Sequence, residues 1–316
     1  MGLTHSLNSA LTRATGFRLT RAAEAEATHK QADSATRQAV KQARKDAAQQ
    51  FRQRIATLRD QNAQLKQRNA QLRDRNTQLK DRAAAARKKL PAHLDPTTRA
   101  TIEQVLPRTM TAPAKLEALV DAVRYLERHG VPGAMVECGV WRGGSMQAVA
   151  ITLLELGSTD RELHLFDTYE GMPAPTEEDW RARDGSSAAD LLATSAKDSR
   201  VWAHADLPDV QAGMAETEYP ADKVHFHVGM VEQNVPDLAP PTIALLRLDT
   251  DWYASTLHEL RHLYDRLSPG GVLILDDYGD WDGARKATEE WLAETGARLF
   301  LAPMATGRIA VKPFAV

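Results

Sequence analysis

The stretch IALLRLDTDWYASTLHELRHLYDRLSPGGVLILDD, residues 243–277, decides the fold class. Apolar runs at 243–249 and 271–277 stand at its two ends, and each run ends in aspartate. Between them, apolar residues recur every three or four positions, the spacing of an amphipathic helix. Apolar runs joined by a helix are typical of parallel strands that are buried on both faces. The stretch therefore predicts two neighbouring strands of an α/β sheet.

The same alternation extends outward in both directions. Residues 134–140, 162–168 and 223–229 form three more apolar runs, and a helix is expected at roughly 113–128. Two final runs, 297–303 and 307–313, are joined by a short turn and predict a hairpin. We therefore expect a mostly parallel sheet with helices on both faces and an antiparallel C-terminal hairpin.

A heptad repeat precedes this α/β part. From residue 55, two positions of each heptad form the seam between paired helices. The a position holds Ile55, Asn62, Asn69 and Asn76, and the d position holds Leu58, Leu65, Leu72 and Leu79. Leucine at d with asparagine at a favours a parallel two-stranded coiled coil. We expect a basic segment at 1–30, a coiled-coil helix at 31–90 and a globular domain at 91–316.

The charges are divided in the same way. Residues 1–95 carry 20 Lys and Arg against 8 Asp and Glu, whereas the rest of the chain carries 20 against 34. Basic side chains flank the seam, at Lys66, Arg73 and Lys80 and at Arg68, Arg75 and Arg82. A homo-oligomeric stalk is the main expectation, and an acidic helical partner, a polyanion or an anionic membrane surface are the alternatives. Nothing in the pattern indicates a nucleic-acid-binding fold.

Cysteine content and hydropathy bear on the compartment. Cys138 is the single cysteine and lies in an apolar run, where a buried thiol is the ordinary expectation. No run approaches the ~18 apolar residues of a transmembrane helix, and the first twenty residues lack the apolar centre of a signal peptide. The sequence predicts a cytoplasmic protein without a transmembrane segment.

Candidate site residues follow the predicted strands, where ligands bind in open α/β sheets. The first strand contains Glu137 and leads into a turn with Gly139, Gly143 and Gly144. Glycine permits close approach of a ligand to backbone amides, although a tight strand-to-helix turn alone would also explain it. An acidic residue here suits a cofactor that carries an amine and a sulfonium better than one that carries a pyrophosphate. Asp167, after the second strand, is placed to accept hydrogen bonds from a ribose diol.

Three carboxylates are expected to converge in one cleft. Asp249 ends one of the two neighbouring strands, and Asp276 and Asp277 end the other. Unpaired carboxylates at such spacing repel each other, and a hard divalent cation with oxygen ligands resolves the conflict. The alternative is that they are strand-end caps and surface acids, but Asp251 and Tyr253 extend the cluster beyond what capping requires.

Four motifs resemble one known family. MVECGVWRGGS, LFDTYEGMP, LRLDTDWYAST and LSPGGVLILDDY, in this order and spacing, resemble the macrocin and mycinamicin O-methyltransferases, a family that also includes enzymes for the noviose sugar of novobiocin-type antibiotics. The resemblance covers roughly residue 111 to the end of the chain. It implies a class I methyltransferase fold and transfer of a methyl group from S-adenosylmethionine to a sugar hydroxyl, with Mg²⁺ as the metal.

The resemblance also implies residue roles. It assigns the methionine end of the cofactor to Glu137, Gly139, Gly143 and Ser145, the ribose to Asp167, and the adenine to Gly229 and Met230. It assigns the metal to Asp249, Asp276 and Asp277, and proton removal to Asp251. Residues 176–217, where such enzymes carry substrate lids, match little, so the acceptor and the methylated hydroxyl stay open.

Three rival interpretations remain. His258-Glu259-x-x-His262 has the spacing of a zinc metalloprotease helix, but residue 268 is Ser where the extended motif needs a third ligand. A helical wheel places both histidines and Glu259 opposite the apolar arc, on the solvent side. The second rival is an inactive methyltransferase-fold scaffold, and the third is an O-methyltransferase for a catechol-like phenol or an envelope glycan.

Overall fold

The computed structural model describes residues 3–87 and 90–314. In the first helix it describes the side chains of residues 26, 28–31, 33–69, 71–73 and 75. The chain divides into two compact units, Met1–Arg82 and Ala83–Val316. Within the described residues, none of the helices combines the length and the apolarity that crossing a membrane requires.

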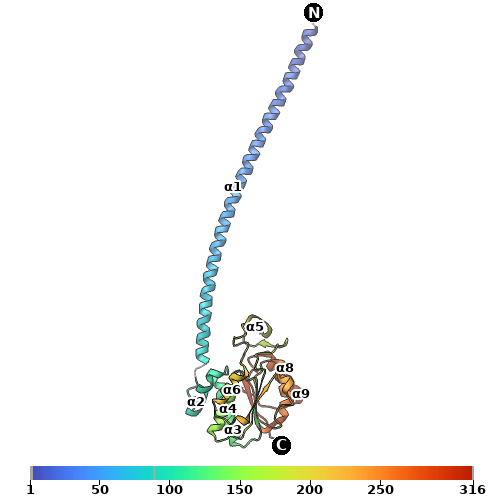
Figure 1. Ribbon diagram of the computed structural model, residues 1–316. Coiled ribbons are helices and arrows are strands. Elements are labelled where there is room, and N and C mark those ends of the chain that lie inside the picture. The colour runs from blue at the N-terminus through green and yellow to red at the C-terminus, as the bar shows by residue number, and fades with distance from the viewer. Residues whose placement is uncertain (1–2, 88–89, 315–316) are drawn as a thin grey trace. The chain divides into compact units, whose positions relative to one another are not determined.

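One helix, α1 (Leu3–Arg87), contains the whole heptad segment (Figure 1). Its 85 residues correspond to about 130 Å at 1.5 Å per residue. The seam leucines Leu58, Leu65 and Leu72 are 52%, 60% and 55% exposed. The side chains of Asn76, Leu79, Lys80 and Arg82 lie outside the described residues. The helical conformation agrees with the heptad pattern, and the coiled coil itself stays a prediction.

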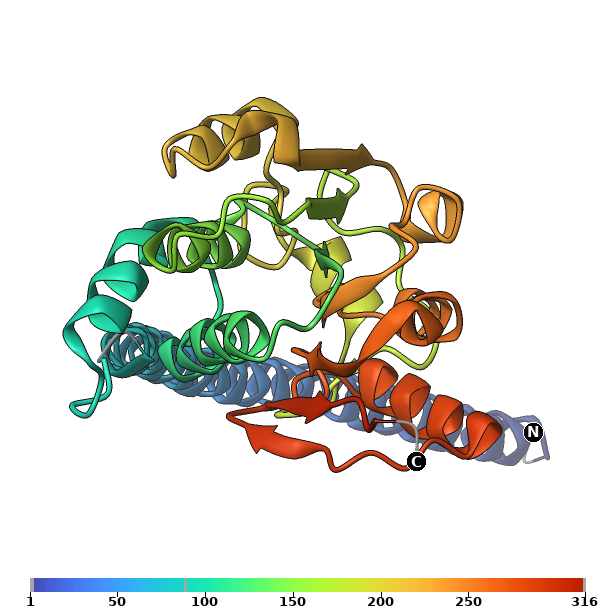
Figure 2. The same cartoon turned by 90° about the horizontal axis from the view of Figure 1, so that it is seen from below.

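The second unit contains a seven-stranded sheet with the order β5-β2-β1-β6-β7-β9-β8. The first five of these strands run parallel to their neighbours, and β9 and β8 are antiparallel. The strands are β1 (Ala134–Cys138), β2 (Leu163–Asp167), β5 (Val224–Val228), β6 (Ile243–Leu248), β7 (Leu267–Leu275), β8 (Ala302–Met304) and β9 (Gly307–Val311). The predicted fold class, a mostly parallel α/β sheet closed by a hairpin, is confirmed; Figure 2 shows the red hairpin at one edge.

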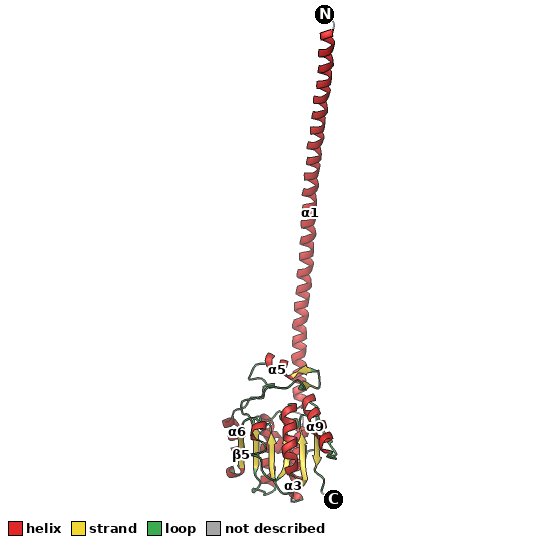
Figure 3. Ribbon diagram, turned by 90° about the vertical axis from the view of Figure 1, so that its right-hand side faces the viewer, coloured by secondary structure: helices red, strands yellow, loops and turns green. Residues whose placement is uncertain are grey.

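Helices cover both faces of this sheet (Figures 1 and 3). On one face lie α2 (Pro96–Val105), α3 (Pro113–Arg128), α4 (Gly144–Glu155) and α6 (Leu207–Ala215), and on the other α7 (Val231–Asn234), α8 (Tyr253–Leu263) and α9 (Asp282–Thr295). Short 3-10 turns occupy Leu106–Arg108, Ala221–Lys223 and Tyr264–Arg266. Each face has its own apolar core, which is why the strands read as continuous apolar runs.

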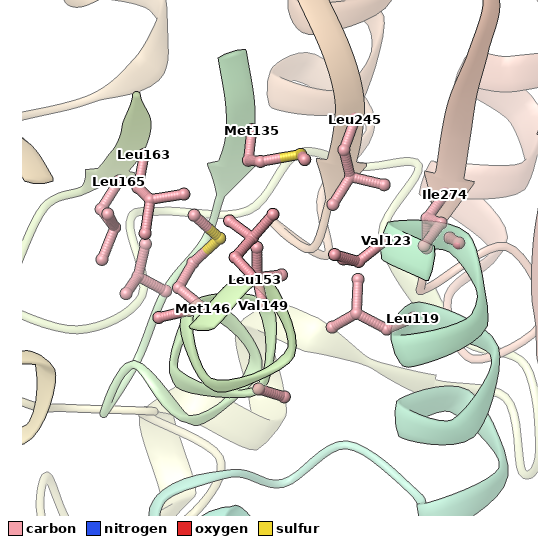
Figure 4. Close-up of a cluster of buried hydrophobic side chains, with 14 of the residues drawn as sticks. Leu119, Val123, Met135, Met146, Val149, Leu153, Leu163, Leu165, Leu245 and Ile274 are labelled. Carbon is pink, nitrogen blue, oxygen red and sulfur yellow. The ribbon is translucent and has the colours of Figure 1, made fainter. Parts of the chain in front are cut away.

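The core beneath α3 and α4 illustrates this packing (Figure 4). Leu119 and Val123 of α3 point toward Leu245 and Ile274 of the sheet, and α4 packs against β1 and β2 beside them. All of these side chains are at most 1% exposed. Their burial fixes the turns that lead into α3 and α4, and both turns border the site described below.

Two local predictions need correction. We expected a strand over 297–303, but β8 begins at Ala302, which pairs with Ile309 of β9. Phe300, two residues earlier, is 85% exposed, so the apolar residues there do not pack against the core. No helix was expected between residue 91 and Pro113, yet α2 occupies Pro96–Val105. Asp95 caps α2 by accepting hydrogen bonds from the N–H groups of Thr97 and Thr98 at 3.1 and 3.0 Å.

Candidate active site

The predicted site residues gather at the carboxyl edge of the five parallel strands. Glu137 lies within β1, Asp167 ends β2, and Asp249 follows β6. Leu248 of β6 is paired with Leu275 of β7, so Asp249 and Asp276 leave the sheet at the same level. Parallel pairing of neighbouring strands is therefore what brings the acidic residues together.

The three predicted metal ligands form one group. Asp249, Asp276 and Asp277 each offer a carboxylate oxygen, and these oxygens lie within 4.8 Å of one another. Asp276 and Asp277 are buried, and Asp249 is half-buried. Burial raises the pKa of Asp277, and the charges of Asp251 and Asp276 raise it further. The geometry suits oxygen coordination of a hard cation, while the role of each residue stays a prediction.

A buried arginine that was not among the predicted site residues lies inside this group. Arg247, on β6, is 2% exposed and is paired in register with Glu137 of β1. Its guanidinium donates hydrogen bonds to Glu137 Oε1, to Asp249 Oδ2 at 2.7 Å and to Asp276 Oδ1 at 2.7 Å. The same group donates to Thr111 Oγ1 at 3.0 Å. The signal was visible as one arginine in the apolar run IALLRLD.

A second buried cation comes from α3. Lys115 Nζ donates to the backbone carbonyl and to Oδ2 of Asp276, both at 2.8 Å, and lies 3.2 Å from Asp280 Oδ2. Burial opposes ionisation of Asp276, but Arg247 and Lys115 hold the pKa of this carboxyl below its usual range. The carboxylates are therefore partly neutralised, which corrects the premise that they are unpaired.

Negative charge still exceeds positive charge in this cluster. Six carboxyl groups face two cations; the carboxyls are Glu137, Asp249, Asp251, Asp276, Asp277 and Asp280, and the cations are Arg247 and Lys115. A buried excess of anions is unfavourable unless cations compensate it or some carboxyls take up protons. The chain's own residues thus leave a deficit that cationic ligands can fill.

Asp251 occupies the loop between β6 and α8. Its φ of 65° places it in the left-handed region, and its N–H donates to Asp277 Oδ2 at 3.1 Å. Burial and then the charge of Asp249 raise the pKa of Asp251 to about 7. A carboxyl group with this pKa is suited to accept a proton near neutral pH.

The donor side of the site is built around Glu137. This side chain is fully buried, its Oε1 is paired with Arg247, and its Oε2 has no hydrogen-bond partner in the described structure. Burial raises the pKa of Glu137 to about 7, with Arg247 opposing the rise. A buried acceptor oxygen without a partner fits an incoming cationic donor such as an amine.

The glycine turn is explained mainly by packing of the protein on itself. Gly139 has φ 83°, and a Cβ there would overlap the carbonyl oxygen of Asp249. At Gly144 a Cβ would lie 2.6 Å from the carbonyl oxygen of Arg108. Gly143 caps α4 with φ 80°, and Ser145 is buried with its Oγ 3.4 Å from Thr111 Oγ1. The tight-turn interpretation therefore holds for the backbone, and the turn lies beside Glu137.

Asp167 has a contact that the sequence did not indicate. Its Oδ2 accepts hydrogen bonds from the N–H groups of Val140 and Trp141, at 2.6 and 3.0 Å, and so ties β2 to the turn after β1. Gly229 donates its N–H to the backbone carbonyl of Asp167 at 3.0 Å, and Met230 is 38% exposed. The predicted ribose and adenine residues are thus neighbours along one rim of the sheet.

The zinc-type motif on α8 does not form a metal centre. His258 Nε2 lies 2.9 Å from the carbonyl oxygen of Val235, and His262 Nδ1 lies 2.8 Å from that of His258. Among the residues that the structure describes, only the aspartate group brings three such ligands together. The helical wheel was wrong for Glu259, which is fully buried and accepts a hydrogen bond from Thr250 Oγ1 at 3.2 Å. The two histidines are half-buried rather than solvent-facing.

Most of residues 172–206 belong to the segment 176–217 that matched no motif, and α5 within them lies beyond this edge of the sheet (Figure 3). They contain β3 (Trp180–Arg181), β4 (Ser186–Ser187) and α5 (Ala188–Thr194). Asp179 is 1% exposed, and its Oδ1 accepts the N–H of Tyr253, the first residue of α8, at 2.7 Å. Trp252 and Trp281 meet edge to face, with centroids 4.8 Å apart, below α5. The segment is therefore anchored next to Asp251.

Sheet order, the buried acidic edge and the anchored segment together define an α/β methyltransferase. The chain belongs to the macrocin-O-methyltransferase (TylF) family, whose sequence model matches residues 49–304. The resemblance inferred from the four motifs is confirmed, as is the prediction of an O-methyltransferase enzyme. The class implies S-adenosylmethionine as the methyl donor.

Individual relatives agree with this assignment. The chain is 34% identical over 188 residues to the 8-demethyl-8-(2,3-dimethoxy-alpha-L-rhamnosyl)-tetracenomycin-C 4'-O-methyltransferase of Streptomyces olivaceus, covering 60% of this chain and 69% of the relative. It is 32% identical over 176 residues to the mycinamicin III 3''-O-methyltransferase of Micromonospora griseorubida, covering 54% and 65%. The solved structure of the O-methyltransferase NovP is 27% identical, covers 66% of this chain and 83% of NovP, and superposes with a TM-score of 0.58.

Proposed function

We propose that this enzyme transfers a methyl group from S-adenosylmethionine to a hydroxyl of a sugar, using Mg²⁺ held at Asp249, Asp276 and Asp277. The sugar acceptor is supported by the relatives, whose names specify a rhamnosyl-bearing tetracenomycin and mycinamicin III. The single observation that carries the metal is the convergence of the three aspartates within 4.8 Å.

The donor site fits the proposed cofactor. Glu137 Oε2 is a buried acceptor without a partner, and the methionine amine of S-adenosylmethionine is a cationic donor that would satisfy it. Gly139, Gly143 and Ser145 would line the same end of the cofactor. Along the adjoining rim, Asp167 would bind the ribose, and Gly229 and Met230 would lie near the adenine.

The metal site fits a divalent cation, because its carboxyl groups outnumber its cations. When bound, Mg²⁺ supplies Lewis-acid polarisation of acceptor oxygens, and S-adenosylmethionine supplies the methyl group. Asp249, Asp276 and Asp277 would hold the ion at the strand ends. Asp251 would take the proton of the reacting hydroxyl, since its pKa of about 7 lets it act as a base at neutral pH.

A direct test uses radiolabelled S-adenosylmethionine with mycinamicin III and a rhamnosyl tetracenomycin as trial acceptors, before and after EDTA treatment. We expect label in a sugar product, loss of transfer in EDTA and recovery on adding Mg²⁺. Full transfer in EDTA would contradict the metal assignment. Transfer to catechol but to no sugar would favour a phenol acceptor, and failure to bind S-adenosylmethionine by calorimetry would favour the inactive scaffold.

For the first unit we propose a parallel two-stranded coiled coil between two copies of the chain, with residues 91–316 as the catalytic domain. The exposed side chains of Leu58, Leu65 and Leu72 support it, because pairing of two helices would remove these apolar side chains from water. A single helix in water gains no such stabilisation. Asn62 and Asn69 at the other seam position can pair across the axis of a parallel dimer. A cytoplasmic location stays a prediction of the sequence.

A further inference from the structure

We propose that Arg247 is a positioning residue shared by the methyl-donor site and the metal site. The inference rests on the proposed function, because it takes Glu137 as the acceptor for the cofactor's amine and the three aspartates as metal ligands. It goes beyond that function by assigning one side chain the task of holding both ligand sets in place.

On the donor side, Arg247 determines which oxygen of Glu137 is free. The guanidinium engages Oε1, and Oε2 is left buried without a partner. A fully buried carboxyl would otherwise tend to become neutral, and an adjacent cation favours the charged form. Arg247 therefore presents a fixed anionic oxygen to a cationic ligand, whereas a neutral or rotated Glu137 would not.

On the metal side, the same guanidinium fixes two of the three aspartates. It bonds one oxygen of Asp249 and one oxygen of Asp276, both at 2.7 Å. These carboxylates follow different strands, β6 and β7, and the Arg247 guanidinium holds both side chains. Such outer contacts orient metal ligands and typically change metal affinity 10- to 100-fold when removed.

Arginine suits this position for a chemical reason. Its planar guanidinium presents several N–H donors in a fixed fork, and here it contacts Glu137, Asp249 and Asp276 at once, with Thr111 as a fourth acceptor. A lysine ammonium is a compact charge whose three donors cannot span the same set. Arg247→Lys therefore keeps the charge and removes the bridging geometry.

Lys115 provides a matched control on the metal side alone. It is also buried, with a side chain 6% exposed, and it contacts Asp276 and Asp280. The structure gives it no hydrogen bond to Glu137. If Arg247 had only a structural role, replacing Arg247 or Lys115 would change the affinity for S-adenosylmethionine alike. In the proposed role, only the replacement of Arg247 lowers that affinity.

The experiment measures two affinities in Arg247→Lys, Lys115→Met and the unchanged full-length chain. Calorimetry in EDTA gives the affinity for S-adenosylmethionine, and electron paramagnetic resonance without cofactor gives the affinity for Mn²⁺. We expect Arg247→Lys to weaken both by tenfold or more, and Lys115→Met to change the affinity for S-adenosylmethionine less than twofold. Thermal melting identifies the folded fraction in every sample.

Two results would overturn the inference. One is a folded Arg247→Lys protein that binds S-adenosylmethionine as the unchanged chain does. The other is an unchanged chain that binds S-adenosylmethionine but no Mn²⁺, which would contradict the metal half of the proposed function and hence a shared role.

A second variant covers the case in which Arg247→Lys does not fold. The double variant Arg247→Gln with Asp276→Asn removes one positive and one negative charge, so the net charge of the cluster is unchanged. Glu137 is not substituted. We expect this protein to bind S-adenosylmethionine at least tenfold more weakly than the Asp276→Asn single variant. Equal affinities in the two would show that Arg247 only neutralises Asp276, which contradicts the inference.

Discussion

Asp251, Trp141 and Tyr169 share an unusual backbone conformation. Their φ angles are 65°, 47° and 55°, in the left-handed region that residues other than glycine rarely adopt. They follow β6, β1 and β2, at the edge where the site lies. Strained residues of this kind cluster at functional sites because packing must hold them there, and here the N–H of Asp251 is held by Asp277.

Replacing Asp251 with asparagine tests its role as the base. Asp251→Asn keeps the shape of the side chain and removes its ability to take a proton. We expect kcat for methyl transfer to fall about 100- to 10,000-fold, the usual contribution of a general base, with unchanged affinity for S-adenosylmethionine by calorimetry. The exposed Asp237→Asn is the control. An unchanged kcat in Asp251→Asn would exclude proton removal by this residue.

Gly139 is where the donor turn and the metal loop touch. A methyl group there would overlap the carbonyl oxygen of Asp249, and φ is 83°. We expect Gly139→Ala to lower the free energy of unfolding by about 2–4 kcal/mol, from overlap plus backbone strain. Gly157→Ala is the matched control, because Gly157 has φ 72° but nothing within 4 Å, so only strain of about 1–2 kcal/mol applies. Equal urea midpoints for both variants would contradict the close packing.

At the scale of elements, α1 makes a prediction about association. Leu65 lies at a seam position and is 60% exposed in the single chain, whereas Gln64 lies on the outer face of the heptad. We expect Leu65→Asp to reduce the mass of the full-length protein in solution from two chains to one, and Gln64→Asp to leave it unchanged.

Because Arg68 and Arg73 flank the seam, association between two copies should strengthen as salt screens their repulsion. Association that weakens with salt would contradict repulsion between these basic side chains across the seam.

The pairing of β2 with β5 brings histidines together. His164 Nδ1 lies 3.0 Å from His227 Nε2, and burial, then His225 and His227, lower the pKa of His164 to about 4. In the unfolded chain this histidine takes up a proton near pH 6.5. The unfolded state therefore binds more protons between pH 6.5 and about 4, and stability should fall as pH falls through this window.

His164→Gln should make that pH dependence shallower. Urea unfolding from pH 7.5 to 4.5 measures it, with the exposed His204→Gln as the control. Because His164 is only partly buried, we expect the sign of the change and a modest size. An identical slope in His164→Gln and in the unchanged chain would show that His164 does not contribute.

Sequence patterns predicted most elements because their causes are local. Each parallel strand is an apolar run, and α3 begins and ends as predicted, at Pro113 and Arg128. The acidic edge could be predicted because parallel strands place their carboxyl ends together. The small elements β3, β4 and α5 could not, since two-residue strands carry no periodicity and depend on Asp179 binding the start of α8.

The partners of the carboxylates could not be predicted from local patterns. Arg247 meets Glu137 through pairing between strands 110 residues apart in sequence, and Lys115 reaches Asp276 across 161 residues. In the sequence, Arg247 is one basic residue in an apolar run, and Lys115 lies on the buried face of an amphipathic helix. That exception is a signal of a buried ion pair, but it does not identify the partner.

For the whole molecule, both halves of the site belong to one compact unit. Glu137 and the three aspartates lie in Ala83–Val316, as do both main apolar cores. The residues proposed for cofactor and metal binding therefore share one unit of the chain.

The most direct test of the central claim is the number of Mn²⁺ ions bound per chain, measured by electron paramagnetic resonance with S-adenosylmethionine present. The convergence of Asp249, Asp276 and Asp277 predicts one ion per chain. It also predicts that Asp277→Asn, which removes one ligand charge, loses that ion while still binding the cofactor. Absence of a bound ion in the unchanged chain, or an undiminished ion in Asp277→Asn, would contradict a metal-dependent methyltransferase at this site.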